Sequence, residues 1–400
     1  MKPHYEVVIV GGGLAGLTLA ALLAQSQHGA SLGITLLDAA ARPDFSADDE
    51  LSLRVSAIAS GSAQLLESIG AWPLISRSRL SPYECMRVWD ENDAPDGAAA
   101  LRFDAAEFAV PQLGFIVENI VLRDALLRRL DATNVELRFA SPMRSLEQSG
   151  QQYKVELQGG ESRVADLVVG ADGARSFVRR AVAIETRQWP YHQTAFVAHL
   201  RPEREHEATA WQRFLRDGPL GILPLADGRV SVVWSTTPDR AKRALDASDD
   251  ALGTMLTDAS DRVLGALEAA GPRGAFPLGA QHAARYVLPG IALIGDAAHA
   301  IHPLAGQGAN LGLQDAAELA AVLDAALQQG LHPGDKPVLR RYERARKGAN
   351  ASMLHLMTGL NRLFATDSRL VAELRSAGMR FFNRSGPIRE RAVKVALGVR

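Results

Sequence analysis

The chain is 400 residues long, 47% hydrophobic and 22% charged, and its 44 Lys and Arg against 45 Asp and Glu give a formal net charge of −1. Because single hydrophobic cores stop growing near about 300 residues, this length predicts two domains, and the composition excludes an intrinsically disordered chain. The balanced charge excludes a protein that binds nucleic acid through a global basic field.

Cys85 is the only cysteine, so an intrachain disulfide is impossible and a reducing compartment is expected. The first residues lead directly into an apolar strand pattern at residues 5–10, without the longer apolar region of a signal peptide. No run approaches the roughly 20 apolar residues of a membrane span. We therefore expect a cytoplasmic protein that is soluble or bound peripherally to the inner face of the membrane.

The start of the chain predicts a strand, a glycine turn, a helix and a second strand, over residues 5–10, 11–16, 17–26 and 33–38. In such a βαβ unit the glycines allow a tight turn and the approach of a pyrophosphate, which the helix N-terminus binds. A carboxylate that ends the second strand accepts hydrogen bonds from a ribose. The predicted cofactor-binding residues here are Gly11, Gly13, Leu14, Ala15, Gly16 and Asp38. A plain turn is the alternative interpretation, and this motif alone does not separate FAD from NAD.

Further along, a polar connection at residues 40–52 precedes a helix-period pattern at 55–69. Two more strand patterns end near an aspartate, and a long Ala- and Leu-rich helix pattern follows the second: residues 165–170, 291–295 and 308–328. Residues 187–280 differ, with short extended runs and a hairpin signal at Asp227-Gly228, which predicts antiparallel sheet.

These patterns predict an α/β (α+β two-domain) architecture: a Rossmann-like dinucleotide-binding domain with an inserted antiparallel-sheet domain and C-terminal helices. The dinucleotide-binding domain is expected to be discontinuous, over residues 1–78, 110–185 and 281–345. The substrate domain is expected over 79–109 and 186–280, and the helical region over 346–400.

The segment that follows the third strand carries the most specific motif. It reads Gly295-Asp296-Ala297-Ala298-His299 and continues from His302 to Asp315 as HPLAGQGANLGLQD. A carboxylate at a strand end can bind a ribityl chain, and the helix that begins near Gly308 would point its positive end at a flavin ring. An ordinary strand-loop-helix crossover is the alternative. The predicted cofactor-binding residues are Asp296, Pro303, Gly306, Gln307, Gly308, Ala309 and Asn310.

This segment resembles the flavin segment of the para-hydroxybenzoate hydroxylase-like flavoproteins, and more narrowly that of the ubiquinone-biosynthesis hydroxylases. The run from Asp172-Gly173 to Arg179 resembles the family's second fingerprint, although Asp-Gly after a strand is also a common turn. Arg54 and Arg123 lie in segments similar to the family's, where the resemblance implies contacts to the FAD; exposed helix arginines are the alternative. Asp38 departs from the family, which more often has Glu there.

The resemblance implies an FAD-dependent monooxygenase. NAD(P)H would reduce the flavin as a transient co-substrate, O2 would add at C4a, and the hydroperoxide would hydroxylate a polyprenylated phenol in ubiquinone biosynthesis, with ring position C5 preferred. No second dinucleotide motif is present, and in this family none is expected for NAD(P)H. The alternatives are a flavin-dependent reductase or dehydrogenase of isoprenoid substrates and a non-catalytic prenyl-binding escort protein on the same fold.

Three further expectations complete the site. No side chain is assigned as a catalytic acid or base, and His299 and His302 lack the companion ligands of a metal site, so no metal is expected. Apolar residues of the antiparallel sheet are expected to close the substrate pocket, with core packing as the alternative for each: Trp211, Phe214, Ile222, Pro224, Val232 and Trp234.

The last 26 residues are strongly basic, with seven Lys or Arg and the single acid Glu390. Ile388, Val395 and Leu397 are interleaved with these charges. An anionic membrane surface or a ubiquinone-pathway multi-enzyme assembly is the expected partner of this tail, and a solvated charged helix face is the alternative.

Overall fold

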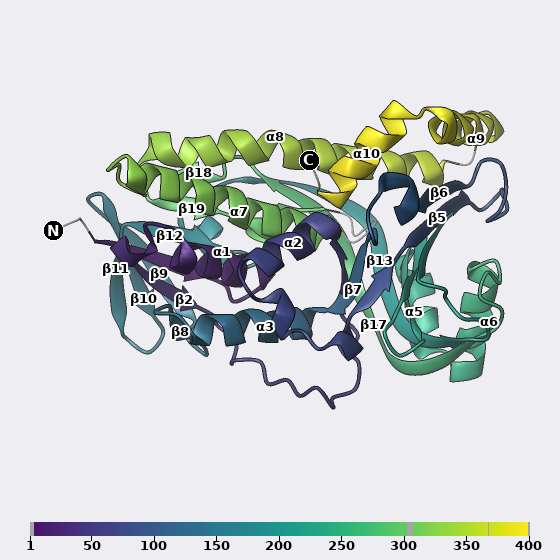
Figure 1. Cartoon of the computed structure of the whole chain (residues 1–400), viewed down its shortest axis with the longest axis horizontal. Helices are drawn as coiled ribbons and strands as arrows, with labels where there is room; N and C mark the ends of the chain where they lie inside the picture. Colours follow the sequence, from purple (N-terminus) through teal and green to yellow (C-terminus); the bar gives the residue numbers. More distant parts are fainter. Residues whose placement is uncertain (1–3, 302–306, 367, 399–400) are drawn as a thin grey trace.

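The structure, a computed structural model, describes residues 4–301, 307–366 and 368–398. A helix-covered parallel sheet occupies one end of the molecule (Figure 1). A large sheet occupies the other end, and it is antiparallel except for the parallel pair β14 (Thr209–Leu215) and β5 (Cys85–Asp90); it is called the antiparallel sheet below. The α/β fold class predicted from the sequence, including the antiparallel region and the C-terminal helices, is confirmed. The domain boundaries given above stay predictions.

The parallel sheet has the strand order β18-β19-β12-β1-β2-β8, and only the β18–β19 pair is antiparallel. Its strands are β1 (Tyr5–Val10), β2 (Leu32–Leu37), β8 (Glu136–Arg138), β12 (Leu167–Gly170), β18 (Val287–Leu288) and β19 (Ile291–Leu293). Strand β1 lies in the middle, with Val7 opposite Leu167 on one side and Ile34 on the other. Because both faces are covered, these strands are continuous apolar runs.

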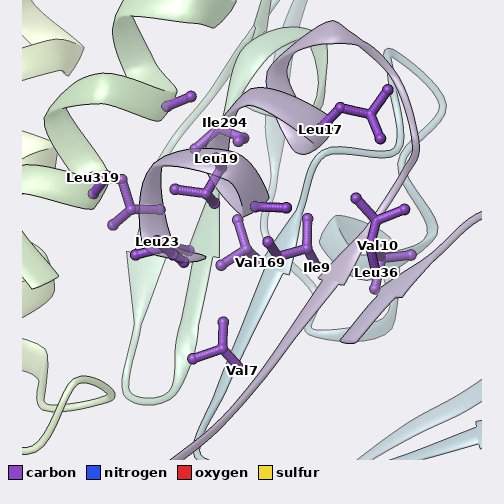
Figure 2. Close-up of a cluster of buried hydrophobic side chains, with 14 of the residues drawn as sticks. Val7, Ile9, Val10, Leu17, Leu19, Leu23, Leu36, Val169, Ile294 and Leu319 are labelled. Carbon is purple, nitrogen blue, oxygen red and sulfur yellow. The ribbon is translucent and has the colours of Figure 1, made fainter. Parts of the chain in front are cut away.

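Helices cover the sheet and build the main core. They are α1 (Leu14–Gln25), α2 (Ser60–Ser68), α3 (Asn119–Asp131), α4 (Phe177–Ala181), α7 (Gln307–Gln328) and α8 (Lys336–Ala365). Figure 2 shows Leu19 and Leu23 of α1 close to Val169, with Leu319 of α7 beside them. All four side chains are completely buried, so the glycine turn between β1 and α1 is held on both sides by packed structure.

Residues 55–69 were expected to be helical throughout, and this is wrong for the first part. Residues Val55–Ala59 form strand β3, which pairs antiparallel with β7 (Gly114–Glu118), and the helix begins only at Ser60. The β-branched Val55 and Ile58 suit a strand, and cross-strand pairing overrides the helical spacing. Strand β4 (Ser81–Tyr83) completes this sheet; β9 (Met143–Ser149), β10 (Gln152–Leu157) and β11 (Ser162–Ala165) form another.

The large sheet has the order β20-β17-β13-β16-β15-β14-β5-β6. Its strands are β5 (Cys85–Asp90), β6 (Leu101–Asp104), β13 (Thr186–Pro202), β14 (Thr209–Leu215), β15 (Gly218–Pro224), β16 (Val230–Thr236), β17 (Leu267–Ala283) and β20 (His299–Ala300). The predicted hairpin joins β15 to β16, and Gly228 has φ +84°, as its turn requires. One face of the sheet packs on α5 (Pro238–Asp246) and α6 (Asp249–Ala259).

The chain ends in α9 (Arg369–Arg384) and α10 (Pro387–Leu397), which lie beside β5 and β6 in Figure 1. No helix in the described part of the chain is both long enough and apolar enough to cross a membrane.

Candidate functional site

A cavity of about 1210 Å³ lies where the carboxyl ends of β1, β12 and β19 meet the antiparallel sheet. This is the place where parallel α/β sheets bind ligands. Most of the predicted cofactor-binding residues line it: Gly11, Gly13, Leu14, Ala15, Asp38, Arg54, Arg123, Asp172, Gly173, Asp296, Gly308 and Ala309. Of the others, Gly16 is buried behind the turn, Gln307 and Asn310 line a neighbouring pocket, and Pro303 and Gly306 lie outside the described residues.

The glycine turn has the geometry of a phosphate cradle. Gly11 has φ +116°, and a side chain there would meet the carbonyl oxygen of Ala171 at 2.3 Å. A Cβ on Gly16 would lie 2.0 Å from the Gly11 carbonyl oxygen, so Gly16 serves helix packing. A Cβ on Gly13 would meet nothing within 4 Å, which leaves the backbone open to the cavity. Helix α1 has no side-chain cap, so its first N–H groups are available to phosphates.

Asp38 and Arg123 fix the second part of this cradle. Asp38 Oδ2 accepts a hydrogen bond of 2.8 Å from the backbone N–H of Gly12, and Arg123 Nε donates to the Gly12 carbonyl oxygen at 2.9 Å. The guanidinium of Arg123 lies 3.7 Å from Asp38 Oδ2. Arg123 is therefore a positioning residue for the loop as well as part of the cavity wall.

Asp172 and Arg179 hold the second motif in place. Asp172 Oδ2 accepts hydrogen bonds from the backbone N–H groups of Phe177 and Val178, at the start of α4. Its other oxygen is buried without a partner among the described residues. Arg179 was open to interpretation as a surface charge, but it is buried and donates to the carbonyl oxygens of Ala174 and Ala297, at 2.7 Å each. It ties the second motif to the third.

Asp296 and Arg54 face the cavity from opposite elements. Asp296 lies in the single turn Gly295–Ala297 after β19, and Arg54 immediately precedes β3. Burial by the surrounding protein raises the pKa of the Asp296 carboxyl, while the charges of His299 and Arg54 lower it. The pair places an acceptor and a cation beside the same cavity, as a ribityl chain and an anionic ring or phosphate would require.

Behind this wall lies a buried polar cluster that the sequence did not predict. Asp315 of α7 accepts hydrogen bonds from the backbone N–H of Gly295 at 3.0 Å and from Arg346 Nε at 2.7 Å. His299 Nε2 lies 2.5 Å from the same carboxylate. Burial alone would raise the pKa of Asp315, but His299 and Arg346 outweigh it and lower the pKa to about 2. Asp315 is one of three carboxylates in this helix, with Glu318 and Asp324, so nothing in the sequence marked it as the buried one.

Asn310 also has a structural role that the sequence did not predict. Its side-chain amide donates to the Ala57 carbonyl oxygen at 2.8 Å and accepts from the Ala59 N–H at 3.0 Å, so it joins α7 to β3. Contact of Asn310 with a cofactor stays a prediction. The cavity also has many lining residues that the sequence did not single out. Among them are Ser56 and Asn119, whose side chains share a hydrogen bond of 2.6 Å, and Ala195 on β13.

A second pocket of about 310 Å³ adjoins the first, because Val55 and Val233 line both. Its walls come from β3 and β7, from the antiparallel sheet and from α9 and α10. They are mostly apolar: Ala57, Met86, Phe103, Ile116, Leu223, Val393 and Leu397. Gln307 and Asn310, at the start of α7, also contribute. This pocket therefore extends from the cofactor cavity toward the C-terminal helices.

The prediction of which residues close this pocket is largely wrong, because only Trp211 of the six lines it. Ile222, Val232 and Trp234 point to the other face of the sheet and are buried against α5 and α6. Neighbouring residues on the same strands line the pocket instead: Gly221, Leu223, Val233 and Ser235. Trp211 lines the pocket, whereas Phe214 stacks on Phe364 with ring centroids 3.8 Å apart, and Pro224 is not part of the lining. Because side chains alternate along a strand, a change of one residue exchanges the two faces.

Within the described part of the chain, no group of three or more His, Cys, Asp or Glu side chains could hold a metal ion. His302 lies outside those residues. His299, the other histidine considered, is engaged with Asp315.

The cavity fits an FAD. Its extent, its glycine cradle at the start of α1, the unpartnered Asp172 oxygen and the Asp296 carboxylate provide what a dinucleotide with a ribityl chain needs. The three motifs, which lie more than 100 residues apart in the chain, meet in this one space. Fold and site thus define a flavoprotein.

Comparison with known proteins agrees. Residues 4–356 match the family described as FAD binding domain. The chain is 37% identical to the Escherichia coli 3-demethoxyubiquinol 3-hydroxylase over 98% of both chains. It is 36% identical to the human mitochondrial ubiquinone biosynthesis monooxygenase COQ6, covering 98% of this chain and 92% of that one. In fold it is similar to PqsL, a probable FAD-dependent monooxygenase of Pseudomonas aeruginosa, with a TM-score of 0.76 and 22% identity over 94% and 99% of the two chains.

The chain is an FAD-dependent monooxygenase. More narrowly, it belongs to the ubiquinone-biosynthesis hydroxylase family, as its motifs predicted.

Proposed function

We propose that this enzyme hydroxylates the aromatic ring of a polyprenylated phenol on the way to ubiquinone. One observation carries the proposal: the apolar pocket adjoins the flavin cavity and shares Val55 and Val233 with it. A ring at that junction would lie beside the flavin, and a prenyl chain would lie against the apolar walls toward α10. The names of the bacterial and human relatives, which refer to ubiquinol and ubiquinone, agree with this substrate class.

The reaction balances with one O2 and one NAD(P)H. One oxygen atom enters the ring, the other leaves as water, and NAD(P)H supplies two electrons. When bound, FAD supplies the redox chemistry that activates oxygen. The residues that line the cavity would bind and orient it: the Gly11–Gly16 turn would hold the pyrophosphate, Asp296 would hold the ribityl chain, and Arg54 would offer a positive charge nearby. The apolar pocket excludes water from the reacting ring.

The most specific part of the proposal is the ring position that the enzyme hydroxylates. The family resemblance gives a preference for C5 over C1 or C6, whereas the bacterial relative is named for a 3-hydroxylation of a demethoxyubiquinol. Incubating the enzyme with a C5-unsubstituted polyprenyl phenol and with a demethoxy-quinol separates the two, since only one of them should gain an oxygen atom. Hydroxylation of the demethoxy-quinol alone would show that the enzyme acts on that substrate and not at C5.

The test of the function is the coupling of three measurements on purified, FAD-loaded protein. We expect NAD(P)H oxidation, O2 consumption and hydroxylated product to rise together when the polyprenyl phenol is added. NAD(P)H oxidation with saturation of an isoprenoid double bond and no oxygen uptake would indicate a reductase instead. Binding of the phenol without turnover would indicate an escort protein.

We also propose that the C-terminal helices attach the enzyme to an anionic membrane surface. Fewer basic side chains of the tail are exposed to a membrane than the sequence suggests. Arg375 is buried in an ion pair with Asp90, Arg389 pairs with Glu107 at 2.6 Å, and Arg400 lies outside the described residues. The exposed cations are Arg380, Arg384, Arg391 and Lys394. A multi-enzyme assembly is the alternative partner, and co-sedimentation with vesicles of purified protein alone distinguishes the two.

A further inference from the structure

Helices α9 and α10 form a hairpin that is anchored to the antiparallel sheet region. Arg375 Nε lies 2.5 Å from Asp90 Oδ2 of β5, with both side chains at most 4% exposed. Ser376 donates to Asp93 at 2.9 Å, and Asn383 donates to the Ala100 carbonyl oxygen at 2.7 Å. These contacts fix which face of the hairpin points inward and which points outward.

The inner face of the hairpin is a wall of the apolar pocket. Phe382 of α9 and Val393 and Leu397 of α10 line it. Ala392 and Ala396 line it as well, and both are also exposed to solvent. The pocket therefore reaches the protein surface along α10.

The outer face of the hairpin exposes large apolar side chains. Leu370, Leu374 and Phe381 are 66%, 64% and 69% exposed and are spaced i, i+4, i+11, so they form one stripe along α9. On α10, Ile388 and Val395 are each 61% exposed and lie seven residues apart, again on one face. Among the described residues outside the hairpin, only two large apolar side chains are more than half exposed: Leu356 on α8 and Val164 on β11.

Positive charge borders these stripes. Arg380 and Arg384 follow the α9 stripe, and Arg391 lies between Ile388 and Val395, all three exposed. The same helices expose the acids Glu373 and Glu390, and Glu390 pairs with Lys394 at 2.8 Å, so the cations are in excess but not alone. Exposed Leu and Phe with Arg beside them are the composition of a helix that lies in the interface of an anionic bilayer, with the cations at the headgroups. A membrane fits this surface better than a protein groove, because the stripes lie on two helices and carry cations at their edges.

We propose that the α9–α10 hairpin is the entry portal for the prenyl chain. Its outer face docks on an anionic phospholipid surface, which brings the opening at Ala392 and Ala396 to the level of the acyl chains. A polyprenyl phenol then passes from the bilayer into the pocket without exposing its chain to water. This inference rests on the proposed function, and the vesicle-binding measurement below keeps the two separable.

The test compares two substrates and a matched pair of variants. The double variant Leu374→Glu/Phe381→Glu alters only the outer stripe, and Leu245→Glu, on a partly exposed residue of α5, is the control for adding acid to a helix surface. Each holoenzyme is assayed with a long-chain polyprenyl phenol in phosphatidylglycerol-containing vesicles and with a water-soluble, short-chain phenol. Co-sedimentation with the same vesicles, and with phosphatidylcholine vesicles, is measured in parallel.

We expect the double variant to lose about tenfold in vesicle binding and in kcat/KM for the vesicle-borne phenol, with unchanged turnover of the soluble phenol. The control should match the wild type, and Ala396→Trp should lower long-chain turnover while vesicle binding is retained. Full long-chain turnover by the double variant, with or without vesicle binding, would overturn the portal. Equal loss with both substrates would also overturn it. A wild type that binds vesicles but hydroxylates neither phenol would contradict the proposed function instead.

Discussion

His299 Nε2 lies 2.5 Å from Asp315 Oδ2, and both side chains are buried directly behind the loop that carries Asp296. The contact joins the antiparallel sheet, through β20, to helix α7 of the flavin domain. The same carboxylate accepts a hydrogen bond from the backbone N–H of Gly295. The geometry of the flavin loop therefore depends on one buried anion.

Replacing Asp315 should destabilise the fold. Asp315→Asn leaves the partly buried Arg346 without its anion, and losing one partner of a buried pair costs about 3 kcal/mol. The effect should depend on pH. The pKa of Asp315 is lowered to about 2 in the folded chain, below the unfolded value near ~3.9, so its stabilisation is complete above about pH 4 and is lost as the pH falls toward 2. Urea unfolding at a series of pH values measures this; an Asn variant with the same acid dependence as the wild type would contradict it.

Asp296 should control the retention of FAD. Asp296→Ala removes an acceptor for the ribityl chain and should weaken flavin binding about tenfold or more, which corresponds to about 1.4 kcal/mol. Asp246→Ala, on an exposed carboxylate of α5 that pairs with Lys242, is the matched control and should keep its flavin. The absorbance ratio of flavin to protein after gel filtration gives the answer. Equal ratios in both variants would remove Asp296 from the site.

Arg54 should set the pH range of that binding. Burial raises the pKa of Asp296, and Arg54 and His299 lower it. Because the acceptor must be ionised, FAD binding should weaken as the pH falls through this pKa. In Arg54→Ala one of the lowering charges is lost, so the midpoint of the pH titration should move upward. Fluorescence titration of the apoprotein with FAD between pH 4 and pH 8 would show the shift, and a downward shift would refute the assignment.

The flavin cavity was largely predictable from sequence and the substrate pocket was not. The glycine turn, Asp172 and Asp296 each follow a buried strand, and the carboxyl ends of parallel strands necessarily meet at one edge. In the antiparallel sheet both faces carry apolar residues: Ile222 faces α5 and α6, while Leu223 faces the pocket. Alternation alone could not decide which set points inward. Contacts between distant segments, such as His299 with Asp315 or Arg375 with Asp90, left no local pattern.

Two adjacent substitutions on β15 should separate the faces of that sheet. Gly221 lines the pocket, and a Cβ there has no neighbour closer than 3.8 Å, so Gly221→Leu should fill the pocket and raise KM for the phenol. Ile222→Ala should leave a cavity against α5 and α6 and cost about 2 to 5 kcal/mol of stability, with little effect on KM in protein that remains folded. Steady-state kinetics and urea unfolding of both variants test this. A raised KM in Ile222→Ala and an unchanged KM in Gly221→Leu would show that the face carrying Ile222 contacts the substrate instead.

Finally, the Arg375–Asp90 pair should hold the C-terminal hairpin in place. Both side chains are almost fully buried, so Arg375→Met leaves the Asp90 carboxylate without a cation, held only by hydrogen bonds from Asn92 to its Oδ1. This change should release α9 from β5, costing about 3 kcal/mol locally. The double variant Arg375→Met/Asp90→Leu removes both charges and should recover much of that loss, because two apolar side chains of similar size replace a buried pair at little cost. Limited proteolysis near residues 366–368 and hydrogen exchange in α9 report the release, and flavin content should stay unchanged because the pair lies outside the flavin cavity. Equal protection of α9 in the wild type and in Arg375→Met would show that the apolar contacts of Phe364 and Met379 hold the hairpin without the ion pair.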